Sequence, residues 1–281
     1  MNKLPITVIV LTKNEELAIA NCLDSVKNFG QILVIDSNST DQTKQIAKSY
    51  GCVTMNFNWN GKYPKKKQWS LELSEIENDW VLFLDADERV SRELELEFNN
   101  LVNDNRLYEY SAIEIPLSYF FMGKELFHGH KVRKIALLNR KFCFFPVFDD
   151  LHVTNMWEVE GHYQPSYSGK LLRLKSKIVH EDPDGLYEYF SRHNRYSDWE
   201  AELQANKYSS KNVRLNRTLQ GRIFDRIPFK PFIFFIYSFG IRAGWKDGRA
   251  GLNYALALSF YYWQISVKVQ ERRHHAQFGK V

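Results

Sequence analysis

The sequence predicts an α/β fold in which a largely parallel sheet carries helices on both faces. Strand-like apolar runs alternate with helix-like segments through the first half of the 281-residue chain, and polar residues follow three of those runs directly. Alternating strands and helices imply a parallel sheet with right-handed crossovers. Ligands of such sheets bind beyond the carboxyl ends of the strands, so the polar residues at those three ends form the candidate site.

The first two strand–helix units occupy roughly the first fifty residues. Ile6–Leu11 is apolar and β-branched, which predicts a buried strand, and Leu17–Val26 has helical spacing. Ile32–Ile35 is a second apolar strand. Ser39–Gln42 fits a capping box, and Gly51 ends the helix that this box opens.

The third unit and a central strand complete the first half. Cys52–Met55 is a short strand, and Pro64 suits the first turn of a helix that runs through Leu73. Trp80–Leu84 is apolar throughout, as a central strand covered on both faces should be.

The second half is less regular. Further elements are predicted as strands at Tyr110–Pro116, Lys131–Asn139 and Leu171–Val179, a helix at Leu186–Ala205 and a polar linker at Ser209–Leu219. We therefore expect a catalytic α/β domain over residues 1–208 and a helical region over residues 209–281.

Composition narrows the partners and the compartment. The net charge of +5 favours an anionic partner such as a nucleotide diphosphate or an acidic lipid, and no nucleic-acid partner is expected. Cys22, Cys52 and Cys143 have neither zinc-site nor disulfide spacing, which favours a reducing compartment. The N-terminus does not resemble a signal peptide, and no uninterrupted apolar run reaches the ~18 residues of a simple transmembrane helix.

Asp85-Ala86-Asp87 is the most informative motif. In extended backbone the two carboxylates point the same way, and such a pair needs a proton or a cation between them. Mg²⁺ or Mn²⁺ prefers oxygen ligands and would neutralise a departing diphosphate. The alternative is a solvated acidic turn before a helix at Ser91, but the position after an all-apolar strand favours a metal site.

The other strand ends suit a nucleotide. Asp36 could accept a hydrogen bond from a ribose hydroxyl or a base N–H, with Ser37 bonding nearby, although a turn and helix cap explain both residues equally well. Thr12–Glu15 is similar. The lysines at 65–67 could attract phosphate, but a charge run is more often a solvated helix face.

The order of these motifs resembles family 2 glycosyltransferases with the GT-A fold. Thr12-Lys13-Asn14-Glu15-Glu16, then Asp36 to Thr43, then Asp85 to Glu88 carry the resemblance. Within that family, the sequence resembles in particular the lipopolysaccharide-core and capsule branch, which includes β-1,4-glucosyltransferases acting on heptose. The specific match covers roughly residues 5–90, and a weaker similarity extends to about 270.

The resemblance implies an inverting transfer from a nucleotide sugar, with UDP as the expected nucleotide. It places Thr12, Asn14, Glu15 and Asp36 in the nucleotide pocket, to which we add Ser37 and Lys67. It also implies that Asp85 faces the ribose and the metal, and that Asp87 holds the metal on the diphosphate.

Inversion requires a general base for the acceptor hydroxyl. Relatives often carry a His-Glu pair shortly before a glycine, and the stretch before Gly161 lacks it. We expect Glu158 to be the base, with Glu160 on the same face of a strand and Asp182 as alternatives. Asp149 and Asp150 are further possibilities, and a solvated strand face is the competing interpretation.

Two aromatic segments lie near the C-terminus. Pro228–Phe239 and Leu252–Val267 are too short to span a bilayer comfortably and are flanked by arginine and lysine, a pattern typical of a membrane interface. The alternative is a helical pair packed on the catalytic domain. We expect peripheral attachment to the cytoplasmic face of the cell membrane, with a lipid-linked or oligosaccharide acceptor.

Two other function classes are compatible with an α/β sheet of this kind. A dinucleotide-binding or P-loop enzyme is disfavoured because neither glycine-rich signature follows the early strands. A non-catalytic, membrane-associated nucleotide-sugar-binding protein with a decayed transferase site remains the alternative. Metal-dependent hydrolysis of a nucleotide sugar distinguishes the enzyme from both.

Overall fold

The computed structural model divides the chain into two compact units. It describes residues 3–147, 150–151, 153, 156–160, 164–205 and 227–278. The sheet unit comprises Met1–Phe120, Lys131–Pro146 and Glu158–Pro183. The helical unit comprises Phe121–His130, Val147–Trp157 and Asp184–Val281. The predicted boundary at 208/209 and the linker Ser209–Leu219 lie outside the described residues.

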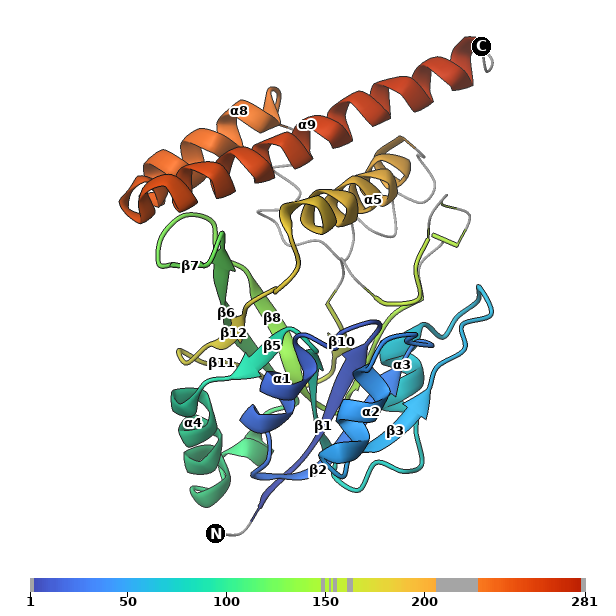
Figure 1. Ribbon diagram of the computed structural model, residues 1–281, viewed down its shortest axis with the longest axis vertical. Coiled ribbons are helices and arrows are strands. Elements are labelled where there is room, and N and C mark those ends of the chain that lie inside the picture. The colour runs from blue at the N-terminus through green and yellow to red at the C-terminus, as the bar shows by residue number, and fades with distance from the viewer. Residues whose placement is uncertain are drawn as a thin grey trace. The chain divides into compact units, whose positions relative to one another are not determined.

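The first half of the sheet is parallel, as the alternating pattern predicts (Figure 1). Its neighbouring strands are, in order, β3 (Val53–Asn56), β2 (Phe29–Asp36), β1 (Leu4–Thr12) and β4 (Trp80–Asp85). All four predicted strands of this half are therefore confirmed, with bounds one to three residues wider at some ends.

The second half of the sheet is mixed. β8 (Arg133–Asn139) runs antiparallel to β4 and to β6 (Ala112–Phe121). The predicted strand Leu171–Val179 is two short strands, β11 (Leu171–Arg173) and β12 (Ile178–His180), each parallel to β6. β12 also pairs antiparallel with β5 (Glu88–Val90), and β9 (Cys143–Phe144) pairs antiparallel with β10 (Ser166–Tyr167).

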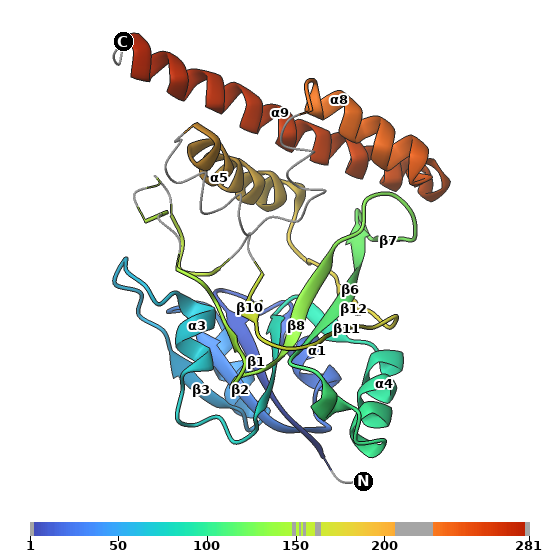
Figure 2. The same ribbon diagram turned by 180° about the vertical axis from the view of Figure 1, so that it is seen from behind.

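Helices cover both faces of the sheet, as predicted (Figures 1 and 2). α1 (Ile19–Ser25), α2 (Thr43–Ser49) and α4 (Arg92–Asn103) bury apolar residues against the face that carries Val8 and Val10. α3 (Lys66–Leu71) packs on the opposite face, which carries Ile9 and Leu11. This alternation along β1 follows from the two-residue period of a strand. The 3₁₀ turn η1 spans Leu107–Glu109.

Three helix starts differ from prediction. α1 begins at Ile19, two residues after Leu17. α2 begins at Thr43, and the capping box predicted from Ser39 does not form, because the Ser39 hydroxyl accepts from the Asn14 N–H at 2.8 Å and donates to Asp36. α3 begins at Lys66, two residues after Pro64. By contrast, Ser91 caps α4 by accepting from the Leu94 N–H at 3.2 Å.

The helical unit contains the two predicted aromatic segments. Its elements are β7 (Lys124–Leu126), α5 (Leu186–Ala205), α8 (Lys230–Phe235), the π-helical η2 (Ile236–Ile241), the 3₁₀ turn η3 (Gly244–Asp247) and α9 (Gly248–Phe278). α9 packs against both α5 and α8, with the rings of Phe234 and Tyr262 at 4.7 Å. Within the described residues, no helix is both long and apolar enough to cross a membrane.

Candidate functional site

Strand register brings the three predicted polar ends to one edge of the sheet. Thr12 pairs with Asp36 across β1 and β2, and Leu11 pairs with Asp85 across β1 and β4. Because all three strands are parallel, their carboxyl ends open on the same side. The strand ends that carry the three predicted motifs are therefore neighbours.

Asp36 lies at the floor of this edge and is fully buried. Its carboxylate accepts from the Thr12 hydroxyl at 3.1 Å, and from both the hydroxyl and the N–H of Ser39, the latter at 2.9 Å. Lys44 Nζ lies 3.7 Å away. These partners offset the cost of burying a charge, so Asp36 organises the loop that follows β2.

The loops after β1 and β2 are bonded to each other. The Asn14 N–H donates to the Ser39 hydroxyl at 2.8 Å, and Asn14 Oδ1 accepts from the Thr40 N–H at 2.9 Å. The Glu15 N–H donates to the Thr43 hydroxyl at 2.7 Å. Asn14 has a φ of 57°, a left-handed conformation that asparagine tolerates better than most residues. The two loops therefore form one braced rim.

Ser37 carries an unsatisfied group at this rim. Its N–H donates to the Thr12 carbonyl at 3.0 Å, but its buried hydroxyl has no hydrogen-bond partner. Buried hydroxyls are usually bonded, because leaving one unpaired costs about 1–3 kcal/mol. The Ser37 hydroxyl therefore lies at the carboxyl end of β2 with its hydrogen-bonding capacity unused.

The lysine run is not the solvated helix face that its composition favours. Lys65 and Lys66 are each only 1% exposed. Lys66 Nζ donates to the Thr12 carbonyl at 2.8 Å, and burial lowers the pKa of Lys66 to about 8 despite nearby carboxylates. Lys67 Nζ donates to the Glu160 carbonyl at 3.2 Å, and burial lowers its pKa as well. The run therefore supplies positive charge inside the site.

Asp85 is paired with a lysine that the sequence analysis missed. Lys134, on β8, lies with its Nζ 3.2 Å from Asp85 Oδ2 and also bonds Glu88. Burial favours the neutral form of Asp85, but the charges of Lys134 and Lys67 more than offset it and hold its pKa well below the usual range. No local motif could have identified Lys134, because it lies 49 residues further along the chain.

Asp87 has the opposite surroundings. Burial raises its pKa to about 6, and the charges of Asp85, Glu88 and Asp182 add to this, while His180 opposes it. His180 Nδ1 lies 3.6 Å from Asp87 Oδ1 and is buried without a hydrogen-bond partner. Asp85 and Asp87 therefore face different partners. Across the described part of the chain, no group of three or more His, Cys, Asp or Glu residues is arranged to hold a metal.

The region of Glu158 and Glu160 differs from prediction. It forms bends and no strand, so the two side chains do not share a strand face. Glu158 lies 3.8 Å from Lys13 Nζ, and its carbonyl accepts from the Lys66 N–H at 2.7 Å. Glu160 is fully buried and caps α3 with both oxygens: Oε2 accepts from the Lys67 N–H at 2.7 Å and Oε1 from the Gln68 N–H at 3.0 Å.

The remaining acidic candidates are dispersed. Asp182, just beyond β12, is close enough to Asp87 for its charge to raise the pKa of that carboxyl. Asp150, in the helical unit, is fully buried and accepts from the Trp199 indole N–H at 2.9 Å. Asp149 and Gly161 lie outside the described residues.

Comparisons with known proteins identify the family of the chain. Residues 7–113 match the model of glycosyl transferase family 2. An uncharacterised glycosyltransferase of Rickettsia typhi is 32% identical over 75% of this chain and 72% of its own length. The lipopolysaccharide core biosynthesis glycosyltransferase LpsC of Rhizobium meliloti is 24% identical over 96% of this chain and 93% of its own. The crystal structure of Staphylococcus aureus TarS 1–349 covers 98% of this chain and 92% of its own, with a TM-score of 0.42 and 14% identity. The match to the family model and the similarity to the Rickettsia typhi protein show that this chain belongs to glycosyltransferase family 2.

Proposed function

We propose that this glycosyltransferase uses a divalent cation to transfer a sugar, with inversion, from a UDP-sugar to a lipid-linked or oligosaccharide acceptor of the cell envelope. The observation that carries the proposal is the meeting of Thr12, Asp36 and Asp85 at adjacent strand ends, beside buried lysines. A nucleoside diphosphate needs both kinds of group: acceptors for its base and ribose, and positive charge for its phosphates.

Nucleoside recognition is assigned to the rim. Asp36 is saturated by its own loop, so its part is to fix the loop that carries Ser37. The unpaired Ser37 hydroxyl supports a direct contact with the nucleotide. Asn14 and Glu15 brace the same rim through their backbone N–H groups, and we propose that both residues line the nucleotide pocket.

The residues present fit a divalent cation at Asp87. Burial and the neighbouring carboxylates raise the pKa of Asp87, and His180 Nδ1, which has no hydrogen-bond partner, lies beside it. Mg²⁺ and Mn²⁺ commonly take one or two carboxylates and complete their coordination with substrate phosphates. Asp87 would therefore hold Mg²⁺ or Mn²⁺, which supplies charge neutralisation to the departing diphosphate. Asp85 is already neutralised by Lys134 and would face the ribose.

Among the three predicted bases, the surroundings favour Asp182. Glu160 is committed to capping α3, and Glu158 faces Lys13. Asp182 lies near Asp87, where the diphosphate would be held, and a base in an inverting transfer must stand close to the reacting sugar. We therefore propose that Asp182 takes the proton from the acceptor hydroxyl as that oxygen bonds to the anomeric carbon.

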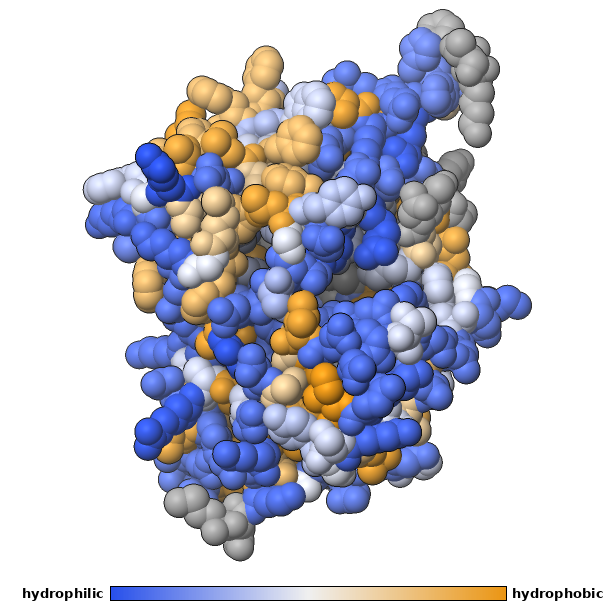
Figure 3. Space-filling view, in the orientation of Figure 1, coloured by the Kyte–Doolittle hydropathy of each residue, from blue (hydrophilic) through white to orange (hydrophobic). Residues whose placement is uncertain are grey.

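An aromatic–basic surface supports peripheral membrane attachment at the cytoplasmic face. We define it by the exposed residues Phe229, Phe232, Ile241, Trp245, Arg242, Lys246 and Arg249. Its four apolar members are between 56% and 82% exposed. Hydrophobic side chains gather over α8 and the first half of α9 in Figure 3. Aromatic residues with a basic fringe suit the bilayer interface.

Turnover of nucleotide sugars tests the proposed activity. Purified protein should release UDP from one member of a UDP-sugar panel in the presence of Mn²⁺, and chelation should stop the release. Binding of a nucleotide sugar without any release, with anionic vesicles and extracted lipid acceptors supplied, would instead indicate the non-catalytic binding protein.

A further inference from the structure

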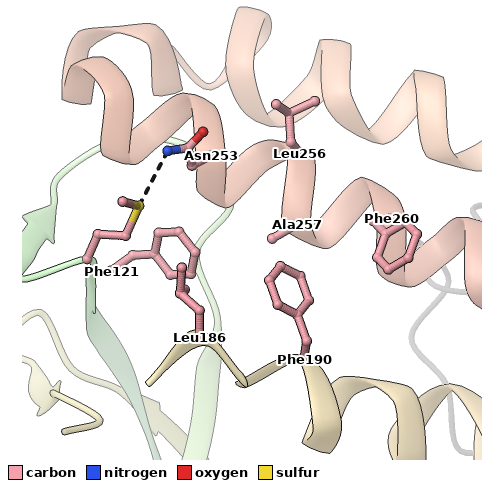
Figure 4. A pocket seen from close by; sticks show the side chains of 8 residues that line it. Phe121, Leu186, Phe190, Asn253, Leu256, Ala257 and Phe260 are labelled. Atoms are coloured by element: carbon pink, nitrogen blue, oxygen red, sulfur yellow. Dashed lines mark hydrogen bonds between the residues drawn. The ribbon is translucent and has the colours of Figure 1, made fainter. Parts of the chain in front are cut away.

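An apolar groove of about 440 Å³ lies within the helical unit (Figure 4). It is formed by the end of β6, the start of α5 and one face of α9. Its side chains include Phe121, Leu186, Phe190, Leu256 and Phe260, and Asn253 is the polar residue among them. The volume falls within the roughly 300–1,000 Å³ range of small-molecule sites.

The groove is built on a packed floor. The Phe121 ring lies 5.3 Å from the Tyr189 ring and 5.4 Å from the Tyr254 ring. The Asn253 amide donates to the Met122 sulfur at 3.3 Å, so even the polar residue is turned toward an apolar neighbour. Leu256 and Phe260 remain 49% and 44% exposed. The groove therefore offers apolar contact and almost no hydrogen bonding.

Basic residues lie near one end of the groove, at the start of α9. Arg249, Asn253, Leu256 and Phe260 follow at three- and four-residue spacing and so share one face of α9. The stretch from Asn253 to Phe260 is about 10 Å long. Arg249 is exposed one turn before Asn253, and Lys124 Nζ donates to the Asp247 carbonyl at 3.0 Å, beside the start of α9.

The segment that carries α8 and most of α9 has little negative charge near these cations, whereas Asp184 and Glu188 flank Leu186 on the α5 side of the groove. Between residues 227 and 270 the sequence has five basic residues and one acidic residue, Asp247. Asp247 is buried, and its carboxylate accepts from the His128 N–H at 2.8 Å and lies 2.9 Å from His128 Nδ1. The positive end of the α9 dipole adds to the cationic character of this end.

We infer that the groove binds one acyl chain of an anionic membrane lipid. The headgroup would lie at the Arg249 end and the chain would run along Leu256 toward Phe260. This inference rests on the proposed membrane attachment and goes beyond it, because it requires a lipid to leave its neighbours and enter a defined site. A lipid fits better than a peptide or a second copy of the chain, since the groove provides a cationic end and few hydrogen-bonding groups.

Titration with lysophosphatidic acids of increasing chain length, below their micelle concentrations, tests the site by calorimetry. One molecule should bind per chain, with affinity rising about fourfold for each added methylene until the groove is filled. Phe260→Ser and Leu256→Gln should weaken binding at least tenfold. Phe142→Ser changes a similarly exposed aromatic residue of the sheet unit, outside the groove and outside the aromatic–basic surface, and should leave binding unchanged. Arg249→Gln should weaken lysophosphatidic acid but not an uncharged monoacylglycerol.

The inference is overturned if no saturable binding occurs or if both groove variants bind as tightly as the unmodified protein. It is also overturned if light scattering shows that Phe260→Ser dissociates an oligomer without affecting lipid binding, because the groove then holds another copy of the chain. Binding of UDP with Mn²⁺, measured in the same variants, reports separately on the proposed transferase site. If the unmodified protein does not bind UDP with Mn²⁺, that result counts against the proposed transferase function and not against lipid binding in the groove.

Discussion

Asp85 and Asp87 stand two residues apart but experience opposite electrostatic fields. Lys134 and Lys67 hold the pKa of Asp85 below its usual range, whereas burial and neighbouring carboxylates raise the pKa of Asp87 to about 6. A cation bound at Asp87 would stabilise the ionised form of this carboxylate, as Lys134 and Lys67 already do for Asp85. The two carboxylates therefore have different roles in one proposed site.

Replacing Asp87 by asparagine should therefore remove the main anchor of the cation. We expect Asp87→Asn to lower kcat by more than tenfold, equivalent to about 1.4 kcal/mol of barrier, without unfolding the protein. Steady-state kinetics and thermal denaturation measure the two effects. Asp79→Asn, at an exposed carboxylate bound to Lys141, is the matched control and should be nearly neutral. Retention of more than a tenth of kcat by Asp87→Asn contradicts the metal-ligand assignment.

The general base can be separated from the other acidic residues by kinetics. Asp182→Asn should lower kcat by orders of magnitude but leave donor affinity nearly unchanged, because a base acts on the acceptor proton. Glu158→Gln should have a smaller effect on kcat, since Glu158 faces Lys13. If Glu158→Gln is inactive while Asp182→Asn keeps its kcat, the general base is Glu158, the residue that the sequence alone favours.

At the scale of elements, Glu160 connects a loop to α3. Its two oxygens accept from the first N–H groups of a short helix whose lysines enter the site. Glu160→Ala should lower the free energy of unfolding by about 1–3 kcal/mol for each N–H left unpaired in the interior. Chemical denaturation measures this loss. Glu72→Ala, on an exposed part of the same segment, is the control, and an equal loss in both variants argues against the cap.

Some residues of the candidate site can be predicted from the sequence and others cannot. Asp36, Asp85 and Thr12 follow apolar strands directly, so the sheet alone brings them together. Lys134 and the cap by Glu160 depend on contacts across dozens of residues, which periodicity does not encode. The burial of Lys66 was missed for the same reason, because charge composition predicts exposure unless a distant partner is known.

The strands illustrate the same limit. The apolar runs of β1, β2 and β4 predicted a parallel sheet correctly. The antiparallel insertion of β8 between β4 and β6 was not predicted, because strand order depends on which edges remain unpaired and not on the strand's own pattern. The spacing of Ser39 predicts a helix cap, but its hydroxyl oxygen accepts from the distant Asn14 N–H while its proton is donated to Asp36.

At the scale of the whole molecule, membrane attachment depends on the aromatic–basic surface. The full chain should float with anionic vesicles, and salt should weaken but not abolish binding, because each basic residue contributes on the order of 1 kcal/mol and the apolar contacts are unaffected by salt. Combining Phe229→Ser, Phe232→Ser, Ile241→Ser and Trp245→Ser should abolish flotation. Leu96→Ser with Tyr108→Ser, exposed residues of the sheet unit, should not alter it. Flotation that survives the fourfold change places the attachment elsewhere.

The central claim is that one end of the sheet binds a nucleoside diphosphate through a divalent cation held by Asp87. Calorimetric titration of the full chain with UDP, in Mn²⁺ and then in excess EDTA, tests it most directly. We predict measurable UDP binding with Mn²⁺, at least a tenfold loss of affinity on chelation, and no further effect of EDTA in Asp87→Asn. Equal UDP affinity with and without the chelator in the unmodified protein would contradict the account.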